Sequence, residues 1–225
     1  MNNDKLEIVQ KVYRFWGKHP LMYTAQDYIT FIGKPQLIRQ EAVNALHLKK
    51  GDTVLEVACG TGRNFPYIEE QISPSGNLIG FDYSFEMLSS AKKAALAKGW
   101  ENIKFVQGDA AELNVKKNQF DGVISVLGMS AIPNYRAALK RCFELLRPGG
   151  TLVICDAGPF RKGPKFLNGL IDKIYSKYAA WDSRKDIIGE MKSIFGNVDI
   201  KTFNFDSFYI VKAIKNENTF KNNSH

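Results

Sequence analysis

The chain is 225 residues long and 44% hydrophobic, which suits one globular domain with additions rather than two domains. No run of about 18 apolar residues occurs, and the N-terminus lacks the basic and then apolar segments of a secretory signal, so both a membrane-spanning helix and export are disfavoured. These features predict an intracellular, cytoplasmic protein.

The net charge of +8 is carried by the two flanks of the chain. Residues 51 to 160 hold 11 basic and 12 acidic residues, whereas residues 1 to 50 hold 8 and 4, and residues 161 to 225 hold 12 and 7. Basic flanks are compatible with an anionic substrate, an acidic membrane surface or nucleic acid. They are equally compatible with a solvated surface, because the basic residues do not form runs.

Three helices are predicted before the first strand, at Leu6–Tyr13, Ala25–Ile32 and Pro35–Leu48. The first two lie in a stretch that is dense in aromatic residues. Such side chains either pack on the core or close over a cationic ligand, for which an aromatic face is suited. Tyr23 and Tyr28 are the two that we consider as lining a site.

The stretch Thr53–Ile68 combines a buried strand, a tight turn and the start of a helix. Its β-branched and aliphatic residues are typical of a parallel strand covered on both faces, and Glu56 is the exception near the end. Gly60 and Gly62 then allow the backbone to turn sharply and to approach a ligand closely. The pattern is typical of a nucleotide-cofactor loop. A dinucleotide-binding turn is the alternative, but it needs a third glycine where Phe65 stands.

Acidic residues follow the next two predicted strands. Asp82 comes after Asn77–Phe81, about 20 residues beyond the glycine turn, where a carboxylate accepts the ribose hydroxyls in nucleotide-binding sheets. Asp109 comes after Ile103–Val106, and it either accepts a hydrogen bond from a ligand or caps a short helix. The carboxyl ends of parallel strands meet at one edge of a sheet, so both carboxylates are expected near the glycine turn.

The later segments complete a seven-stranded sheet. Strands are predicted at Phe120–Leu127 and Thr151–Cys155, and a closing hairpin at Val198–Phe205 and Ser207–Ile214. Between them, Phe166–Trp181 has the pattern of an amphipathic helix. The predicted fold class is α/β, with a Rossmann-like, mostly parallel seven-stranded sheet, a C-terminal antiparallel hairpin, and helices on both faces.

These elements predict a single domain over residues 1–215 followed by a disordered tail at 216–225. No cluster of metal-ligating residues and no Ser-His-Asp arrangement is apparent in the sequence, and the oligomeric state is not indicated. The predicted parts of the domain are an N-terminal helical cap at 1–50, a cofactor-binding core at 51–155, a lid insertion at 156–190 and the closing hairpin at 197–215.

The run Glu56-Val57-Ala58-Cys59-Gly60-Thr61-Gly62 resembles the first motif of the class I S-adenosylmethionine-dependent methyltransferases, an acidic residue followed by a glycine-rich turn. One departure is Ala58, where the family has its first glycine. The resemblance covers residues 51 to 155 strongly and the hairpin more weakly. It implies S-adenosylmethionine as the cofactor, bound at the carboxyl ends of the strands. The cofactor-binding residues that it implies are Glu56, Ala58, Gly60, Gly62, Asn64, Asp82, Tyr83, Met87, Asp109, Ala110 and Ser125.

The resemblance also implies where the reaction takes place. Family members hold the adenine with residues that correspond here to Tyr83, Met87 and Asp109, and they place the transferable methyl group beside the end of the fourth strand. Tyr23, Tyr28 and Met129 are therefore predicted to line the substrate side of the site. If the acceptor carries a proton, a base is needed, and Asp156 at the end of the fifth strand is the candidate catalytic residue.

The acceptor is predicted to be a small molecule or a lipid head group that is methylated on nitrogen or oxygen, by analogy with family members of this layout. A lid formed by residues 1–33 and 156–190, rich in basic and aromatic residues, is predicted to receive an amphipathic or anionic molecule, and peripheral membrane contact is compatible with it. Family enzymes that methylate base nitrogens often carry an Asn/Asp-Pro-Pro-aromatic run, whose absence argues against nucleic acid. An RNA methyltransferase and a non-catalytic scaffold that binds the cofactor remain the alternatives.

Overall fold

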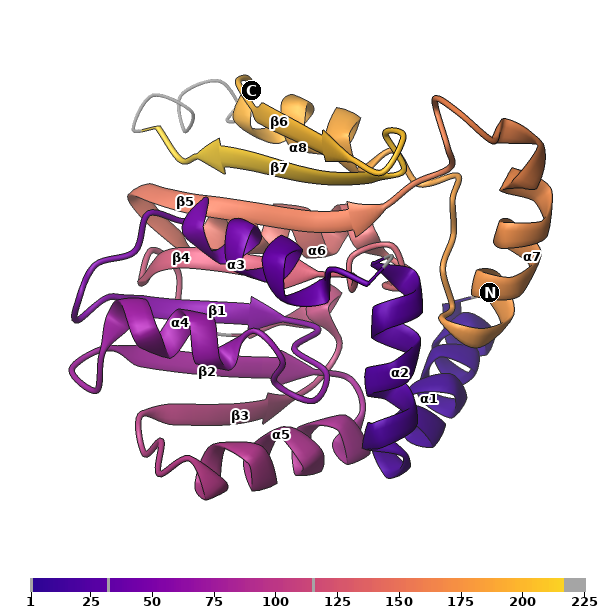
Figure 1. Ribbon diagram of the computed structural model, residues 1–225. Helices are drawn as coiled ribbons and strands as arrows, with labels where there is room; N and C mark the ends of the chain where they lie inside the picture. The colour runs from indigo at the N-terminus through magenta and orange to yellow at the C-terminus, as the bar shows by residue number, and fades with distance from the viewer. Residues whose placement is uncertain (1, 32, 115, 217–225) are drawn as a thin grey trace.

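The computed structural model describes residues 2–31, 33–114 and 116–216, and side chains from residue 5 onward within these ranges. It contains a seven-stranded sheet that is flanked by helices on both faces, as Figure 1 shows. None of the helices in these ranges is long and apolar enough to cross a bilayer. The strands are β1 (Thr53–Val57), β2 (Asn77–Asp82), β3 (Ile103–Gln107), β4 (Phe120–Val126), β5 (Leu146–Ala157), β6 (Asp199–Phe203) and β7 (Phe208–Ile214).

The strand order β3-β2-β1-β4-β5-β7-β6 confirms the predicted topology. The first five strands are parallel, whereas β7 runs antiparallel to β5 and β6 runs antiparallel to β7. The chain leaves β1 in one direction to form β2 and β3 and later returns to form β4 on the other side of β1. Such a reversal opens a crevice at the carboxyl ends of the strands, where ligands bind in open α/β sheets.

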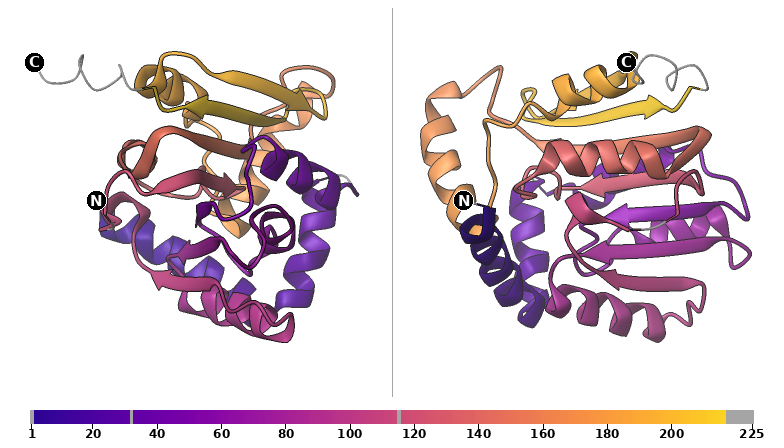
Figure 2. Two further views of the ribbon diagram at one scale, coloured as in Figure 1. Left: turned by 90° about the vertical axis from the view of Figure 1, so that its left-hand side faces the viewer. Right: turned by 180° about the vertical axis from the view of Figure 1, so that it is seen from behind.

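Two hydrophobic clusters hold the helices to the sheet. Successive residues of β1 point to opposite faces, so Val54 belongs to one cluster and Leu55 and Val57 belong to the other. Helices α3, α4 and α5 cover the first face and α6 and α8 cover the second, as the two views of Figure 2 show. These helices are α3 (Pro35–Asn44), α4 (Phe65–Ile72), α5 (Phe85–Ala97), α6 (Tyr135–Leu145) and α8 (Ile187–Phe195).

A third group of helices lies across the carboxyl ends of the parallel strands rather than on a face of the sheet (Figures 1 and 2). The group combines helices from residues 2–30 with helices from residues 165–178, so the predicted cap and the predicted lid lie side by side. Tyr13 Oη donates to the carbonyl of Ala179 at 3.0 Å, and Trp16 Nε1 donates to that of Tyr178 at 2.7 Å. The members are α1 (Asn2–Lys18), α2 (Pro20–Thr30), the 3-10 turn η2 (Lys165–Leu167) and α7 (Asn168–Tyr178).

Several element boundaries differ from the sequence-based predictions. The first helix is longer than expected, because α1 runs from Asn2 to Lys18. Strand β5 begins at Leu146 rather than at Thr151, because Leu146 already pairs with Phe120 of β4 ahead of a shift in the register. Helix α8 was not predicted, and it corrects the end of the lid insertion, because Ile187 and Phe195 are buried in the core beside the sheet. Of the predicted disordered tail, residues 217–225 lie outside the described part of the chain.

A glycine allows α1 to pack directly against α5. A Cβ added at Gly17 would lie 2.7 Å from the backbone carbonyl carbon of Glu86 and 2.7 Å from the nitrogen of Met87. The contact is completed by Ser90 Oγ, which donates to the carbonyl of Gly17 at 2.9 Å, and by an ion pair of 3.3 Å between Arg14 and Glu86. Helix α1 is therefore held at the edge of the sheet by a close backbone contact.

We expect Gly17→Ala to lower the free energy of unfolding by about 1–3 kcal/mol, because the added methyl group overpacks this contact. Denaturant unfolding followed by circular dichroism measures the change. The matched control is Gly169→Ala in α7, where an added Cβ meets nothing within 4 Å, so that stability should stay the same or rise. Equal stability of the Gly17→Ala protein and the original would contradict the assigned role.

Candidate active site

Two adjoining cavities lie between the carboxyl ends of the strands and the helices that cross them. The first lies over the glycine loop after β1, and the second lies beneath α2 and α7. Tyr13, Tyr23 and Leu127 line both cavities and therefore form the neck between them. We call the first the loop cavity and the second the aromatic cavity.

The loop cavity is lined by six of the predicted cofactor-binding residues. Asp82 is central among them: Oδ2 accepts from the Gly60 N–H at 2.8 Å and Oδ1 accepts from the Ser84 N–H at 2.9 Å. Burial raises the pKa of Asp82 to about 6, although these backbone hydrogen bonds oppose the rise. The six residues are Ala58, Gly60, Asp82, Tyr83, Asp109 and Ala110.

Asp109 caps a short helix, which is one of the two roles that the sequence left open. Its Oδ1 accepts from the Ala111 N–H at 2.9 Å, which caps the short 3-10 turn η1 (Ala110–Glu112). The same residue lines the loop cavity. The two roles are compatible, because a carboxylate has two oxygens and several lone-pair positions.

The glycine loop has a backbone conformation that side chains tolerate poorly. Gly60 has φ 56° and Gly62 has φ 76°, and Ala58 adopts φ 54° although it carries a Cβ. A Cβ at Gly62 would lie 2.6 Å from the ring of Phe65. The Phe65 ring therefore packs against the loop, at the sequence position where a dinucleotide-binding turn needs its third glycine.

A buried chain of hydrogen bonds runs behind the loop and connects it to α2. Glu56 Oε1 accepts from Asn64 Nδ2 at 2.6 Å, and Asn64 Oδ1 accepts from Arg39 at 2.8 Å. The Arg39 guanidinium also donates to both oxygens of Asp27, at 2.8 and 2.9 Å. Arg63 contributes a second cation 3.0 Å from the Asp27 carboxylate. Sequence patterns gave no signal for Asp27 or Arg39, because they lie far from the glycine motif along the chain.

Two buried polar atoms beside the loop have no hydrogen-bond partner among the described atoms, Glu56 Oε2 and Ser125 Oγ. Burial raises the pKa of Glu56 to about 8, although the Asn64 hydrogen bond and the Arg39 charge oppose the rise. Unsatisfied buried polar atoms are rare and often mark the place of a ligand. A ligand ammonium group would satisfy Glu56 and lower its pKa.

This donor and acceptor set fits the cofactor that the sequence resemblance implies. S-adenosylmethionine carries an ammonium group, a ribose diol and an adenine amino group, all of which donate hydrogen bonds. Glu56, Asp82 and Asp109 are three acceptors at the ends of three neighbouring strands. Among the described residues, no group of three or more His, Cys, Asp and Glu side chains is placed to hold a metal ion.

Several other predicted site residues line neither cavity, and three of them, Glu56, Asn64 and Ser125, are buried beside the glycine loop. Met87 and Met129 are fully buried, the latter in the core cluster beneath α6, and Gly62 belongs to the loop without lining its cavity. Tyr28 lies on the outer side of α2, where its hydroxyl accepts from Gln36, whereas Tyr23 points into the neck. The two tyrosines are five positions apart, which turns them toward different sides of the helix.

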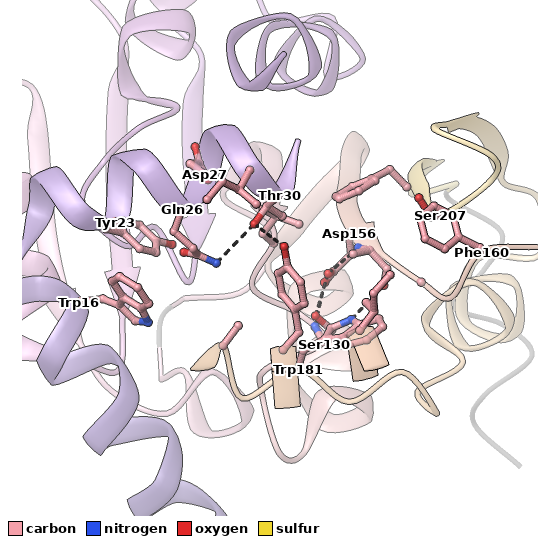
Figure 3. A pocket seen from close by; sticks show the side chains of 18 of the residues that line it. Trp16, Tyr23, Gln26, Asp27, Thr30, Ser130, Asp156, Phe160, Trp181 and Ser207 are labelled. Carbon is pink, nitrogen blue, oxygen red and sulfur yellow. Dashed lines mark hydrogen bonds between the residues drawn. The ribbon is translucent and has the colours of Figure 1, made fainter. Parts of the chain in front are cut away.

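The aromatic cavity has a volume of about 210 Å³ and is enclosed mainly by large rings. Trp16 and Tyr23 come from α1 and α2, whereas Tyr175 and Trp181 come from the lid, as Figure 3 shows in part. Thr30 Oγ1 and Tyr175 Oη are 3.2 Å apart, which joins α2 to α7 over the cavity. Trp181 Nε1 donates to the carbonyl of Ala157 at 3.1 Å. The pattern of the sequence did not identify these lid aromatics as site residues.

Asp156 and Ser130 form a hydrogen-bonded polar pair in the wall of the aromatic cavity. Asp156 is 1% exposed at the end of β5, and its two oxygens accept from the hydroxyl and the N–H of Ser130 at 2.7 and 2.8 Å (Figure 3). Burial raises the pKa of Asp156, while the hydrogen bonds from Ser130 oppose the rise. Lys185 supports this arrangement from behind, because its Nζ donates to the carbonyl of Ser130 at 2.6 Å.

The described residues that line the aromatic cavity include no lysine, arginine or histidine. The basic residues of the predicted lid are therefore not among those that line this cavity. Its polar positions are instead Gln26, Thr30, Ser130, Asp156, Asn168 and Ser207, with Asp27 held by Arg39. Such a lining suits an uncharged ring compound with hydroxyl groups better than a phosphate-bearing one.

The sequence and the structure were compared with known proteins. A family model described as "Methyltransferase domain" matches residues 54–150. The demethylmenaquinone methyltransferase of Staphylococcus carnosus is 30% identical over 177 residues, which cover 75% of this chain and 73% of that protein. A protein of the same name from Oceanobacillus iheyensis is 28% identical over 203 residues, which cover 83% of this chain and 85% of that protein. The crystal structure of a SAM-dependent methyltransferase from Aquifex aeolicus has a TM-score of 0.56 at 17% identity, covering 78% and 88% of the two chains.

Calorimetry with S-adenosylhomocysteine tests the position of the ammonium group. If that group approaches Glu56 Oε2, a carboxyl with a pKa of about 8 ionises on binding, and nearly one proton is released at pH 7. Titrations in two buffers with different ionisation enthalpies measure the release. In the Glu56→Gln variant the release should vanish. A binding enthalpy that is independent of the buffer in the original protein would contradict this assignment.

Proposed function

The chain belongs to the class I S-adenosylmethionine-dependent methyltransferases, and from this premise we propose that its acceptor is a hydroxyl-bearing aromatic compound of the reduced-quinone type. The observation that carries the proposal is the aromatic cavity, which opens through the neck onto the loop cavity and has Asp156 and Ser130 as its polar group. The names of the relatives from Staphylococcus carnosus and Oceanobacillus iheyensis support a quinone-like acceptor.

When bound, S-adenosylmethionine supplies an electrophilic methyl group on its sulfonium. Glu56, Asp82 and Asp109 are the residues proposed to hold it. Asp82 and Asp109 line the loop cavity together with Ala58, Gly60, Tyr83 and Ala110, and Glu56 is buried beside the glycine loop. The rings of Trp16, Tyr23 and Trp181 position a flat acceptor and exclude water from it. Alignment of the two reactants is the main contribution of the protein to such a displacement.

Asp156 is the proposed base for the acceptor hydroxyl, either directly or through Ser130 Oγ. Removal of the hydroxyl proton raises the electron density on that oxygen and on the neighbouring ring carbons, which are the candidate acceptor atoms. Burial raises the pKa of Asp156, which brings its proton affinity closer to that of the hydroxyl. Its hydrogen bonds to Ser130 hold the carboxylate in one orientation at the end of β5.

The alternatives are less compatible with the cavity. A phosphate-bearing head group or an RNA would need cations beside the acceptor, and no Lys, Arg or His is among the described residues that line the aromatic cavity. A non-catalytic scaffold would not need a second cavity connected to the first through a neck.

The test is transfer of a labelled methyl group from S-adenosylmethionine to reduced demethylmenaquinone dispersed in detergent, alongside fractionated cell extract. We expect label in the reduced quinone and in the lipid fraction of the extract. Label found only in the RNA fraction, with an affinity that falls steeply between low and moderate salt, would overturn the proposed acceptor and favour an RNA substrate.

Asp156→Asn should lower kcat for the reduced quinone by about 10²–10⁴, because the general base is lost. The affinity for S-adenosylhomocysteine should not change, since Asp156 lines only the aromatic cavity. In the original protein, kcat should rise with pH until the Asp156 carboxyl is ionised. The control is Asp199→Asn, whose exposed side chain pairs with Lys212 on the far hairpin. Full activity of Asp156→Asn would show that no base is needed at this position.

A further inference from the structure

The lid carries an apolar stripe on its outer side. Phe166, Leu170, Ile174 and Tyr178 follow one another at intervals of four residues, and they are 85%, 58%, 44% and 52% exposed. This spacing places side chains along one side of a helix. None of the described side chains of α7 is buried. The helix has an inner side that lines the aromatic cavity and an outer side that is left exposed by the described part of the chain.

Helix α2 adds a second exposed apolar surface at the same cavity. Leu21 and Ile29 are 86% and 73% exposed, two turns apart on one side of the helix, and Met22 is also exposed. Ile29 lines the aromatic cavity as well, so this surface reaches its mouth. Figure 1 shows α1, α2 and α7 together at the end of the molecule where the parallel strands point. We call the stripe of the lid and these residues of α2 the apolar rim.

Basic residues flank the apolar rim. Residues 160 to 180 contain five lysines and arginines and one acidic residue, Asp172. All five basic side chains are exposed, and Asp172 is partly buried and accepts from Ser183. Because the aromatic cavity is lined by no described basic residue, this charge faces outward rather than toward the substrate. The five are Arg161, Lys162, Lys165, Lys173 and Lys177.

We propose that the apolar rim docks on an anionic lipid bilayer and that the acceptor enters the aromatic cavity from the bilayer. A helix with an apolar stripe between lysines is typical of segments that lie in the plane of a membrane interface, with the apolar side in the acyl region and the amines at the head groups. The basic excess matches the negative surface potential of anionic lipid. The exposure and the charge of the rim support the docking by themselves. The entry route of the acceptor also depends on the function proposed above.

Docking of the apolar rim would also explain why α7 is apolar on both its inner and its outer side. A lid that only closed the cavity would present polar residues to water, as the outer sides of surface helices do. Here the inner residues Ile171 and Tyr175 line the cavity, while the outer stripe is equally apolar. An apolar acceptor moving from the bilayer to the neck would pass between α2 and α7 without crossing water.

Flotation of the full chain with lipid vesicles tests the docking. The vesicles are phosphatidylcholine alone, or phosphatidylcholine mixed with about one third phosphatidylglycerol, a composition at which basic segments respond to surface charge. We expect the protein to float with the anionic vesicles, to bind the neutral ones at least about tenfold more weakly, and to detach as salt rises.

Two variants separate the two contributions. Leu170→Ser with Ile174→Ser should weaken binding to both kinds of vesicle, and Lys173→Gln with Lys177→Gln should weaken binding only to the anionic kind, each by about tenfold or more. The matched control is Leu96→Ser with Lys98→Gln, which alters an exposed leucine and lysine at the far end of α5. Thermal unfolding confirms that each variant is folded.

Unchanged flotation of both rim variants, or no flotation of the original protein, would overturn the docking. Sedimentation equilibrium gives a further test. A dimer that the Leu170→Ser and Ile174→Ser changes abolish would also overturn the docking, because the apolar stripe would then be a contact between two copies of the chain. Activity on detergent-dispersed reduced demethylmenaquinone separates the two proposals: the rim variants should keep it and lose activity only on acceptor embedded in anionic vesicles. If the original protein shows no activity on the acceptor in detergent, the proposed acceptor is wrong, but the result of the vesicle flotation still holds.

Discussion

The buried contact between Arg39 and Asp27 is the constraint on which the site depends. Both side chains are almost completely buried, and the guanidinium also donates to Asn64, which in turn bonds Glu56 at the end of β1. Removing one partner of such a pair costs about 3–5 kcal/mol, because the other charge is left buried alone. The position of α2 over the strands is thereby tied to the glycine loop that we propose holds the cofactor, and Tyr23 lies at the neck between the two cavities.

At the end of the molecule where α2 crosses the strands, the cavity has a largely apolar lining and the outer surface is basic. Inside, rings from α1, α2 and the lid line a cavity whose wall also holds polar side chains, among them the Asp156 and Ser130 pair and Asp27. Outside, the same helices expose apolar stripes and lysines. The five basic residues of 160–180 are exposed on this outer surface, whereas the described residues that line the cavity include no lysine, arginine or histidine.

The sheet and much of the loop cavity could be predicted from sequence, because Glu56, Asp82 and Asp109 lie at or next to the carboxyl ends of strands, and parallel strands bring these ends together. The aromatic cavity could not be predicted in this way. Tyr175 and Trp181 approach α1 and α2 only through tertiary contacts between segments about 150 residues apart, which no local pattern encodes. Tyr28 and Met129 were predicted from their neighbourhood in sequence, but helical phase and core packing turn them away from the cavities. The short helix α8 was not predicted, because it directly follows the predicted lid insertion in the sequence.

A crystal structure with S-adenosylhomocysteine tests the central claim, that the two cavities hold cofactor and acceptor on either side of one neck. We expect the ribose at Asp82, the amino group at Glu56 and the sulfur between Tyr13, Tyr23 and Leu127, facing the aromatic cavity. A sulfur atom that faces the open groove between Thr61 and Phe85 on the other side of the loop would contradict the account, because no path would then lead from the methyl group to the aromatic cavity.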